Sequence, residues 1–167
     1  MATTEWAHTT VMLKEAVEAL DVQAEATYVD TTFGRGGHAK RILEHLSPKG
    51  RLIAFDKDPQ AVASALALND PRLQIHHQGF AALAQLPPQS VRGVLMDLGV
   101  SSPQIDNPAR GFSFRHDGPL DMRMGHEGPT AADLVNSLSE ANLADALFQL
   151  GEERHARRIA RAVVEMR

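Results

Sequence analysis

A glycine-rich turn between a strand and a helix constrains the fold of this chain most. The stretch DTTFGRGGHA, residues 30–39, follows the strand-like TYV and precedes the helix-like KRILEHL. Glycines at such a turn let a ligand approach the backbone and the amides that begin the helix. The spacing Gly34-x-Gly36-x-x-Ala39 matches a permissive form of the dinucleotide-binding signature. The turn therefore predicts a nucleotide-bearing ligand held on a strand, a turn and a helix.

Short apolar strands alternate with helices through the first hundred residues. The expected strands are 28–32, 51–56, 73–76 and 91–97, and the expected helical segments are 11–20, 39–46, one that starts at Pro59, and 80–86. Asp58 is placed to cap the helix that begins with Pro59. This alternation predicts an α/β fold with a Rossmann-like parallel sheet covered on both faces, whose ligand binds beyond the carboxyl ends of the strands.

The pattern changes after Leu98. Residues 98–129 are rich in glycine and proline and lack a helical period, and loops of that length are usually functional or disordered. Helices then resume: Thr130 and Ser139 are expected to cap two of them, the second running to Leu150 before Gly151 breaks it. Four strands and an unfinished helix predict the N-terminal part of a larger protein, with a sheet domain over 1–104 and part of a helical domain over 105–167.

Composition narrows the class of protein. The chain has 167 residues, a net charge of -4 and no cysteine, so we expect a globular, cytoplasmic protein without disulfides or thiolate metal sites. No apolar run approaches the roughly 18 residues of a membrane helix, and the N-terminus lacks the order of a signal peptide. The eight histidines form no metal-ligand spacing, so no metal site is predicted.

One local basic patch stands out against the acidic net charge. It comprises Arg154, Arg157, Arg158 and Arg161, which recur at helical spacing near the C-terminal end. Contact with nucleic-acid phosphates and an ordinary solvated helix face are both consistent with this pattern. The sequence also leaves open whether the protein forms a homodimer.

Asp30 separates two cofactors that the glycines leave open. It ends the first expected strand, where a carboxylate repels the pyrophosphate of NAD but attracts the ammonium and sulfonium of S-adenosylmethionine (SAM). Asp56, at the end of the second strand, is placed to accept hydrogen bonds from ribose hydroxyls. These residues favour SAM. The alternative without a ligand is a turn that keeps its glycines only for close packing of strand and helix.

Further candidates follow the third and fourth strands. Phe80 lies where an aromatic ring can flank an adenine, and a place in the core explains it equally well. Asp97 ends the fourth expected strand, beside a polar turn that includes Ser101 and Ser102. A carboxylate there can accept a hydrogen from an acceptor amine or bind the amine of the donor, or it can merely cap the turn.

In the long loop, apolar and polar residues alternate, as in Phe112-Ser113-Phe114 and in the segment over 120–124. One interpretation is a platform on which nucleobases stack. The other, which we favour for the Phe and Met residues, is a loop pinned to the core by its apolar edge. The core alternative does not account for Asp117, Asp121 and Arg123, although an internal ion pair would explain two of these three.

Five motifs occur in order along nearly the whole chain: DTTFGRGGH, FDKDPQA, MDLGVSSPQ, RGFSFRHDGPLDMRM and GEERHARRIAR. With them the sequence resembles the bacterial 16S rRNA cytosine-N4 methyltransferases. The resemblance implies a class I SAM-dependent methyltransferase fold with an inserted helical domain, and methylation of one cytidine of small-subunit rRNA near the decoding site. By motif, the implied donor contacts are Gly36, Gly37, His38, Asp56, Phe80, Asp97 and Gln104, with His38 acting through its backbone N–H.

The catalytic prediction is Asp97 with Ser101 and Ser102, acting on the exocyclic amine. DNA amino-methyltransferases related to this family carry Asn or Asp followed by Pro-Pro and an aromatic residue in this position, whereas this chain has Ser101-Ser102-Pro103-Gln104. The family also continues beyond the motifs found here, through the rest of the inserted domain and further strands. Two other functions remain open: a nucleotide-dependent oxidoreductase, and a non-catalytic rRNA-binding fragment.

Overall fold

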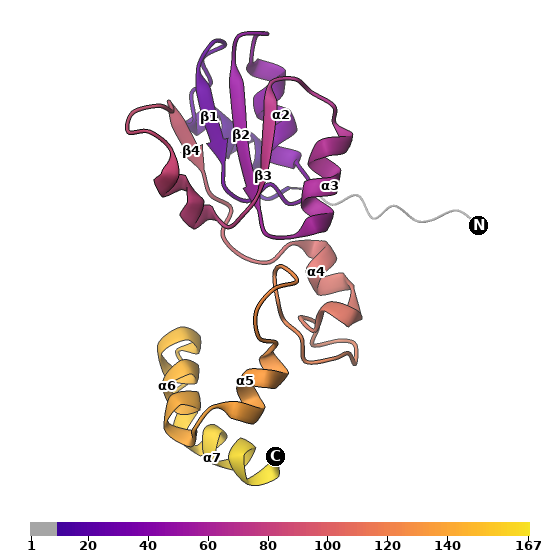
Figure 1. Cartoon of the computed structure of the whole chain (residues 1–167), viewed down its shortest axis with the longest axis vertical. Coiled ribbons are helices and arrows are strands. Elements are labelled where there is room, and N and C mark those ends of the chain that lie inside the picture. Colours follow the sequence, from indigo (N-terminus) through magenta and orange to yellow (C-terminus); the bar gives the residue numbers. More distant parts are fainter. Residues whose placement is uncertain (1–9) are drawn as a thin grey trace, which may run out of the picture. The chain divides into compact units, whose positions relative to one another are not determined.

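The structure is a computed structural model that describes residues 10–167, shown in Figure 1. Its elements are α1 (Leu13–Ala19), β1 (Thr27–Asp30), α2 (Gly37–His45), β2 (Arg51–Asp56), α3 (Pro59–Ala67), β3 (Leu73–His77), η1 (Phe80–Gln85), β4 (Gly93–Leu95), α4 (Ser102–Asp106), η2 (Pro108–Arg110), α5 (Ala131–Ser137), α6 (Glu140–Gly151) and α7 (Ala156–Met166). The chain divides into two compact units, the first ending at Ser102 and the second running from Pro103 to Arg167. Each is described by itself below.

The first unit contains a four-stranded sheet in the order β3-β2-β1-β4, with every neighbouring pair parallel. This confirms the predicted parallel α/β sheet. Chain order reverses between β1 and β4, which in open α/β sheets is the point where ligands bind. The fourth strand is shorter than the predicted 91–97: pairing ends at Leu95, opposite Asp30, because β1 ends there and turns away.

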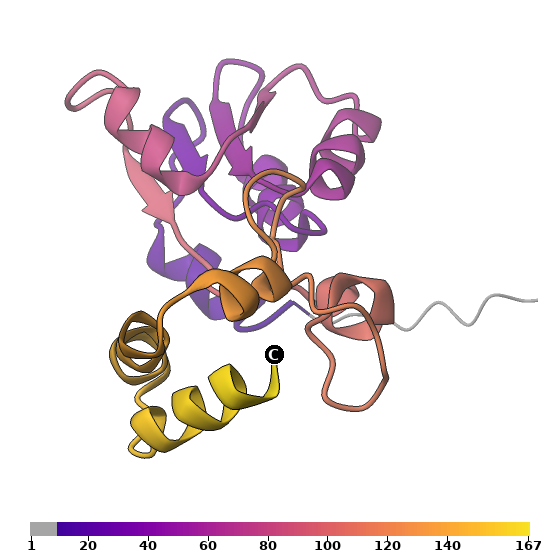
Figure 2. The ribbon, with the colours of Figure 1, turned by 60° about the horizontal axis from the view of Figure 1, so that its bottom comes forward.

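Alternation along the strands divides the core into two layers. Tyr28, Leu52 and Ala54 face α1, α2 and α3, where Ile42 is fully buried among them. Side chains of the intervening strand positions point to the opposite face. There Phe55 packs with residues of η1 rather than a long helix. The sheet is therefore covered by three helices on one face and by the short η1 on the other, and the turns at the carboxyl ends of its strands lie between these two layers (Figures 1 and 2).

Helix caps agree with the sequence in three places and differ in one. The predicted Ser139 cap of α6 is confirmed, since its hydroxyl accepts from the Asn142 amide. The Asp58 carboxylate accepts a hydrogen bond from the Gln60 amide, with Pro59 at the first helical position. Thr130 and the third helical residue of α5 form a reciprocal capping box. The predicted break at Gly151 is wrong: α6 includes Gly151, and the left-handed residue that ends it is Glu152, at φ 52°. Its amide closes the last turn on the Phe148 carbonyl at 3.0 Å.

The second unit contains three helices beyond the long loop. Helices α6 and α7 pack through Leu143, Ala144 and Ala160, and the small alanines let the two helices approach closely (Figure 2). The Arg167 guanidinium donates to the Val135 and Leu138 carbonyls at the end of α5, each at 2.8 Å. Among the helices of residues 10–167, none is both long and apolar enough to cross a membrane.

Candidate functional site

Three carboxylates gather at the carboxyl edge of the sheet. Asp30 is the last residue of β1, Asp56 is the last residue of β2, and Asp97 follows β4 by two residues. The strands are parallel neighbours, so their ends share one edge. The Asp97 amide donates to the Thr32 hydroxyl at 2.8 Å, which ties the segment after β4 to the turn after β1. Sequence reasoning missed Thr32, whose role depends on a contact across 65 positions of the chain.

The Asp30 carboxylate is buried and only partly hydrogen-bonded by the described residues. Its side chain is fully buried, and Oδ1 accepts one hydrogen bond, from the Thr32 amide at 3.0 Å. Oδ2 has no hydrogen-bond partner among the described residues. Burial raises the pKa of Asp30 to about 7; the Asp56 and Asp97 carboxylates add to the rise and the Thr32 amide opposes it. Asp30 is thus a buried carboxylate with one hydrogen-bonded oxygen and one oxygen that has no partner among the described residues.

Asp56 instead holds two turns in place. Its Oδ2 accepts from the Gly34 amide at 2.8 Å, and its Oδ1 accepts from the Asp58 amide at 2.8 Å. The turn after β1 and the turn after β2 are thus joined through one carboxylate. Each carboxylate oxygen has a second lone pair, so Asp56 keeps the capacity to accept further hydrogen bonds from hydroxyls.

The glycines of the turn are needed by the fold itself. Gly34 and Gly36 have φ of 54° and 74°, in the left-handed region. A Cβ on Gly36 would lie 2.6 Å from the ring of Phe33, which is buried, and a Cβ on Gly37 would overlap the Thr10 hydroxyl. Packing therefore accounts for part of the glycine pattern, as the alternative interpretation held, and it also keeps the backbone of the turn bare.

His38 faces the third carboxylate through its side chain. The ring is buried, and its Nε2 lies 3.1 Å from the Val11 carbonyl oxygen. A carbonyl oxygen only accepts, so Nε2 is the nitrogen that donates in this contact. Nδ1 lies 4.0 Å from Asp97 Oδ2. The resemblance implied only the backbone N–H of His38; a buried ring in the first turn of α2 gave no signal in the sequence.

Two other predicted contacts lie in different surroundings. Phe80, the first residue of η1, is 50% exposed, so of the two alternatives left open for it, a place in the core does not hold. Ser102 begins α4, and Gln104 in the same helix is buried. Asp97 and Ser101 belong to the first unit, whereas Gln104 belongs to the second.

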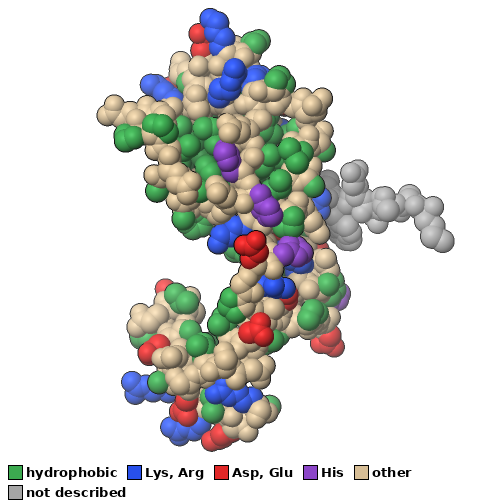
Figure 3. Space-filling view, viewed as in Figure 1, with side chains coloured by type: hydrophobic (Ala, Val, Ile, Leu, Met, Phe, Trp, Pro, Cys, Tyr) green, Lys and Arg blue, Asp and Glu red, His purple; other side chains and the backbone are tan. Residues whose placement is uncertain are grey.

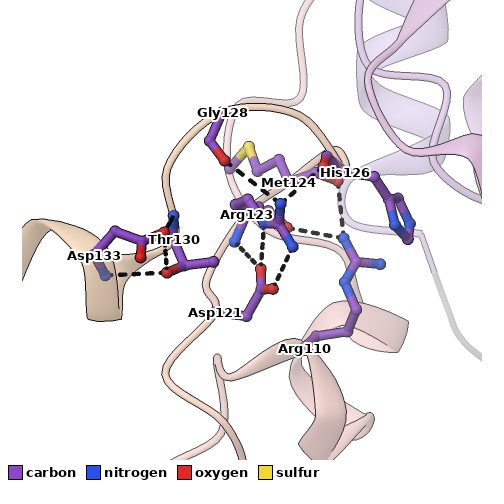
Figure 4. A network of polar contacts seen from close by, with 8 residues as sticks. All are labelled: Arg110, Asp121, Arg123, Met124, His126, Gly128, Thr130 and Asp133. Atoms are coloured by element: carbon purple, nitrogen blue, oxygen red, sulfur yellow. Dashed lines mark hydrogen bonds and ion pairs between the residues drawn. The ribbon is translucent and has the colours of Figure 1, made fainter.

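The long loop is held by polar contacts. The Arg123 guanidinium donates to both Asp121 carboxylate oxygens, at 2.7 and 3.0 Å, and to the His126 carbonyl (Figure 4). The Arg110 guanidinium donates to the Arg123 and Met124 carbonyls. The Arg123 hydrogen bonds hold the pKa of Asp121 down, at about 2. The predicted ion pair is confirmed.

The apolar side chains of this loop do not pin it to a core. Phe114 is fully exposed, and three further residues are each between 42% and 46% exposed: Leu120, Met122 and Met124. The interpretation that we favoured is therefore wrong for these four residues, whereas Phe112 is partly buried. The polar contacts around Arg123 order the backbone, and the apolar groups are left facing solvent.

The basic patch lies around α7 without forming a surface of one sign. Its four arginines are exposed, and Arg161 Nε lies 3.5 Å from a Glu140 oxygen. Acidic and basic side chains are interspersed over the helical unit in Figure 3. Within residues 10–167, no three histidine or acidic side chains are grouped so that they could hold a metal ion.

Comparison with known proteins places this geometry in a family. The sequence profile described as the MraW methylase family matches residues 5–167. The chain belongs to this family. It is 59% identical over 168 residues to the ribosomal RNA small subunit methyltransferase H of Variovorax paradoxus (strain S110), covering 98% of this chain and 55% of that protein. It is 54% identical over 159 residues to the protein of the same name from Polaromonas naphthalenivorans (strain CJ2), covering 95% and 52%. The chain therefore spans about half the length of the curated relatives it matches.

Proposed function

We propose that this chain carries the SAM site, and part of the acceptor site, of an enzyme that methylates the N4 amine of a cytidine in small-subunit 16S rRNA near the decoding site. The observation that carries the proposal is the buried Asp30 carboxylate at the switch point of the sheet, with an oxygen that lacks a partner. Such a group calls for a cationic ligand.

The residues of the turn fit the methionine end of SAM. When bound, SAM supplies a methyl group on a sulfonium, and its ammonium adds a second positive charge. Asp30, Asp56 and Asp97 make this edge of the sheet negative, which favours those cations and opposes the pyrophosphate of a dinucleotide. The same charges argue against a nucleotide-dependent oxidoreductase.

The other end of the donor has its own candidates. Asp56 retains lone pairs for the ribose hydroxyls while two backbone amides fix its orientation. The half-exposed ring of Phe80 offers a face for the adenine. Amides at the start of α2, those of Gly37 and His38, are donors for the methionine carboxylate.

Asp97 is our candidate for the acceptor side. An exocyclic amine shares its lone pair with the ring, so the site must align it and accept its hydrogens as positive charge develops. The Asp97 side chain is 51% exposed, and its backbone is fixed on Thr32. Ser101 and Ser102, in the following turn, are candidates to orient the base. The rRNA substrate is proposed from the names of the relatives, cytosine N4 and the decoding site from the resemblance, and a cytoplasmic location follows from that substrate.

A calorimetric comparison of SAM and NADH tests the donor site. We expect SAM to bind the chain and NADH to give no heat; the reverse would refute the use of Asp30 made here. Asp97→Ala is then assayed for methyl transfer to small-subunit rRNA in a protein of the relatives' full length, where undiminished activity would refute its role. Binding of rRNA without any binding of SAM would support a non-catalytic rRNA-binding protein instead.

A further inference from the structure

The charged groups that act on Asp30 carry the same negative charge as its own carboxylate. The charged groups that act on it are Asp56, from the end of β2, and Asp97, from beyond β4, and both are carboxylates. From α2, the His38 ring faces Asp97 and not Asp30, with Nδ1 4.0 Å from Asp97 Oδ2. A buried carboxylate in such surroundings takes up a proton or a cation. Oδ2 is the oxygen without a hydrogen-bond partner among the described residues.

We propose that Asp30 exchanges a bound proton for the positive charge of the methyl donor, and so makes the preference for the sulfonium donor over its demethylated thioether product depend on pH. The proposal rests on the donor function proposed above. It assigns Asp30 a role in distinguishing the two ligands beyond contributing to affinity.

The exchange balances as a simple acid dissociation. In the free protein, Asp30 Oδ2 carries the proton. When the cationic donor binds, that O–H bond breaks, its electron pair stays on the oxygen, and the proton leaves to the buffer. The thioether product, S-adenosylhomocysteine, has one positive charge fewer. It stabilises the ionised carboxylate less wherever its sulfur lies, because charges in a buried site interact over several ångströms. The product therefore leaves more of the proton on Asp30.

Calorimetry in two buffers with different heats of ionisation counts the protons directly. At pH 7 we expect release of about half a proton per SAM bound, because a group whose pKa is about 7 is half protonated there, and less release with the thioether. Between about pH 6 and pH 8 the ratio of the thioether Kd to the SAM Kd should rise by roughly tenfold.

Variants separate Asp30 from other titrating groups. Both ligands carry an α-ammonium, whose ordinary pKa is about 8. Asp30→Asn measures the proton release that comes from this ammonium alone. In Asp30→Asn the ratio of the two Kd values should stay constant with pH. Asp97→Asn, which removes one negative neighbour, should reduce the release at pH 7. Asp145→Asn, the same change at an exposed site on α6, should match the wild type.

The outcomes distinguish this proposal from the one on which it rests. SAM binding without proton release, or a Kd ratio that does not change with pH, would overturn the exchange and leave the donor function standing. A chain that binds no SAM would overturn both. If Asp30→Asn fails to fold, the two-buffer measurement on the wild type still decides.

Discussion

Asp30 and Asp121 are the same residue type in opposite physical situations, one in each unit. Asp30 is buried, accepts one hydrogen bond from the Thr32 amide, and has its pKa raised by burial to about 7, with two other carboxylates adding to the rise. Asp121 lies in the long loop, is held by Arg123 through two short contacts, and has its pKa lowered to about 2. Among the described residues, one oxygen of the first carboxylate lacks a hydrogen-bond partner, whereas the second carboxylate is paired with a guanidinium.

This contrast distinguishes a carboxylate suited to ligand binding from a carboxylate that holds a loop in place. A carboxylate that a neighbouring guanidinium satisfies orders its own loop and needs nothing more. A carboxylate that burial and like charges leave unsatisfied costs stability until a cation arrives. On this basis we propose that the ligand binds at the edge of the sheet, and that the Asp121–Arg123 contact supports the loop that carries the exposed apolar side chains.

The largest effect is expected from Gly36→Ala. The new Cβ would meet the Phe33 ring in a left-handed backbone conformation, so the turn that holds Asp30 and Asp56 must shift. We expect a loss of about 2–3 kcal/mol in the free energy of unfolding and of measurable SAM binding. Gly151→Ala is the control: nothing lies within 4 Å of its added Cβ, and stability should be kept or slightly raised. Equal losses in both variants would break the comparison.

Asp30→Asn is expected to move affinity and stability in opposite directions. SAM binding should weaken by about 10- to 100-fold, because a charged partner is lost. The folded wild type keeps a proton that the unfolded chain releases, so its stability falls as pH rises from about 4 to about 7. The variant lacks that loss and should melt at a higher temperature than the wild type at pH 8, measured without ligand. A variant that is less stable at pH 8 would contradict the account of Asp30.

Arg123→Lys tests the bracing of the loop. Lysine cannot reproduce the forked contact with Asp121 or reach the His126 carbonyl in the same geometry. Amide hydrogen exchange over residues 107–130 should become faster, with SAM affinity unchanged. Because the Asp121 pKa is lowered, the contribution of this pair is present above about pH 4 and is lost only as pH falls toward 2. Loop exchange that responds to pH between 5 and 8 in step with Asp30 would contradict the separation.

The smallest effect on stability is expected from Phe114→Ala. The side chain is fully exposed, so the free energy of unfolding should change by less than about 0.5 kcal/mol. If the ring stacks on a base, affinity for a small-subunit rRNA fragment should fall by about 5- to 100-fold, and Phe114→Trp should retain it. Unchanged RNA binding in the alanine variant would remove the loop from the acceptor site.

Much of the sheet unit could be predicted because its signals are local. Short apolar runs located the strands, and Asp58 with Pro59 marked the start of α3 as the structure has it. Asp30 could be singled out from its place at a strand end alone. Its missing partner could not, since that depends on which groups the fold brings beside it from β2 and β4.

The errors arose where tertiary contacts decide. The alternation around Phe114 has the same pattern whether its apolar edge is buried or exposed, and polar contacts from Arg110 and Arg123 hold the loop instead. Glycine usually takes the left-handed position at a helix end, yet here Glu152 takes it. The contact between His38 and Asp97 joins segments far apart in the sequence and has no local signature.

The central claim is that a cationic methyl donor binds at the turn that Asp30 and Asp56 organise. Backbone amide resonances followed by NMR during a SAM titration test it most directly. We predict that amides in residues 30–38 and 56–58 shift in the wild type and fail to respond at the same SAM concentrations in Asp30→Asn. Unchanged resonances in those segments of the wild type, or the same response in both proteins, would contradict the claim.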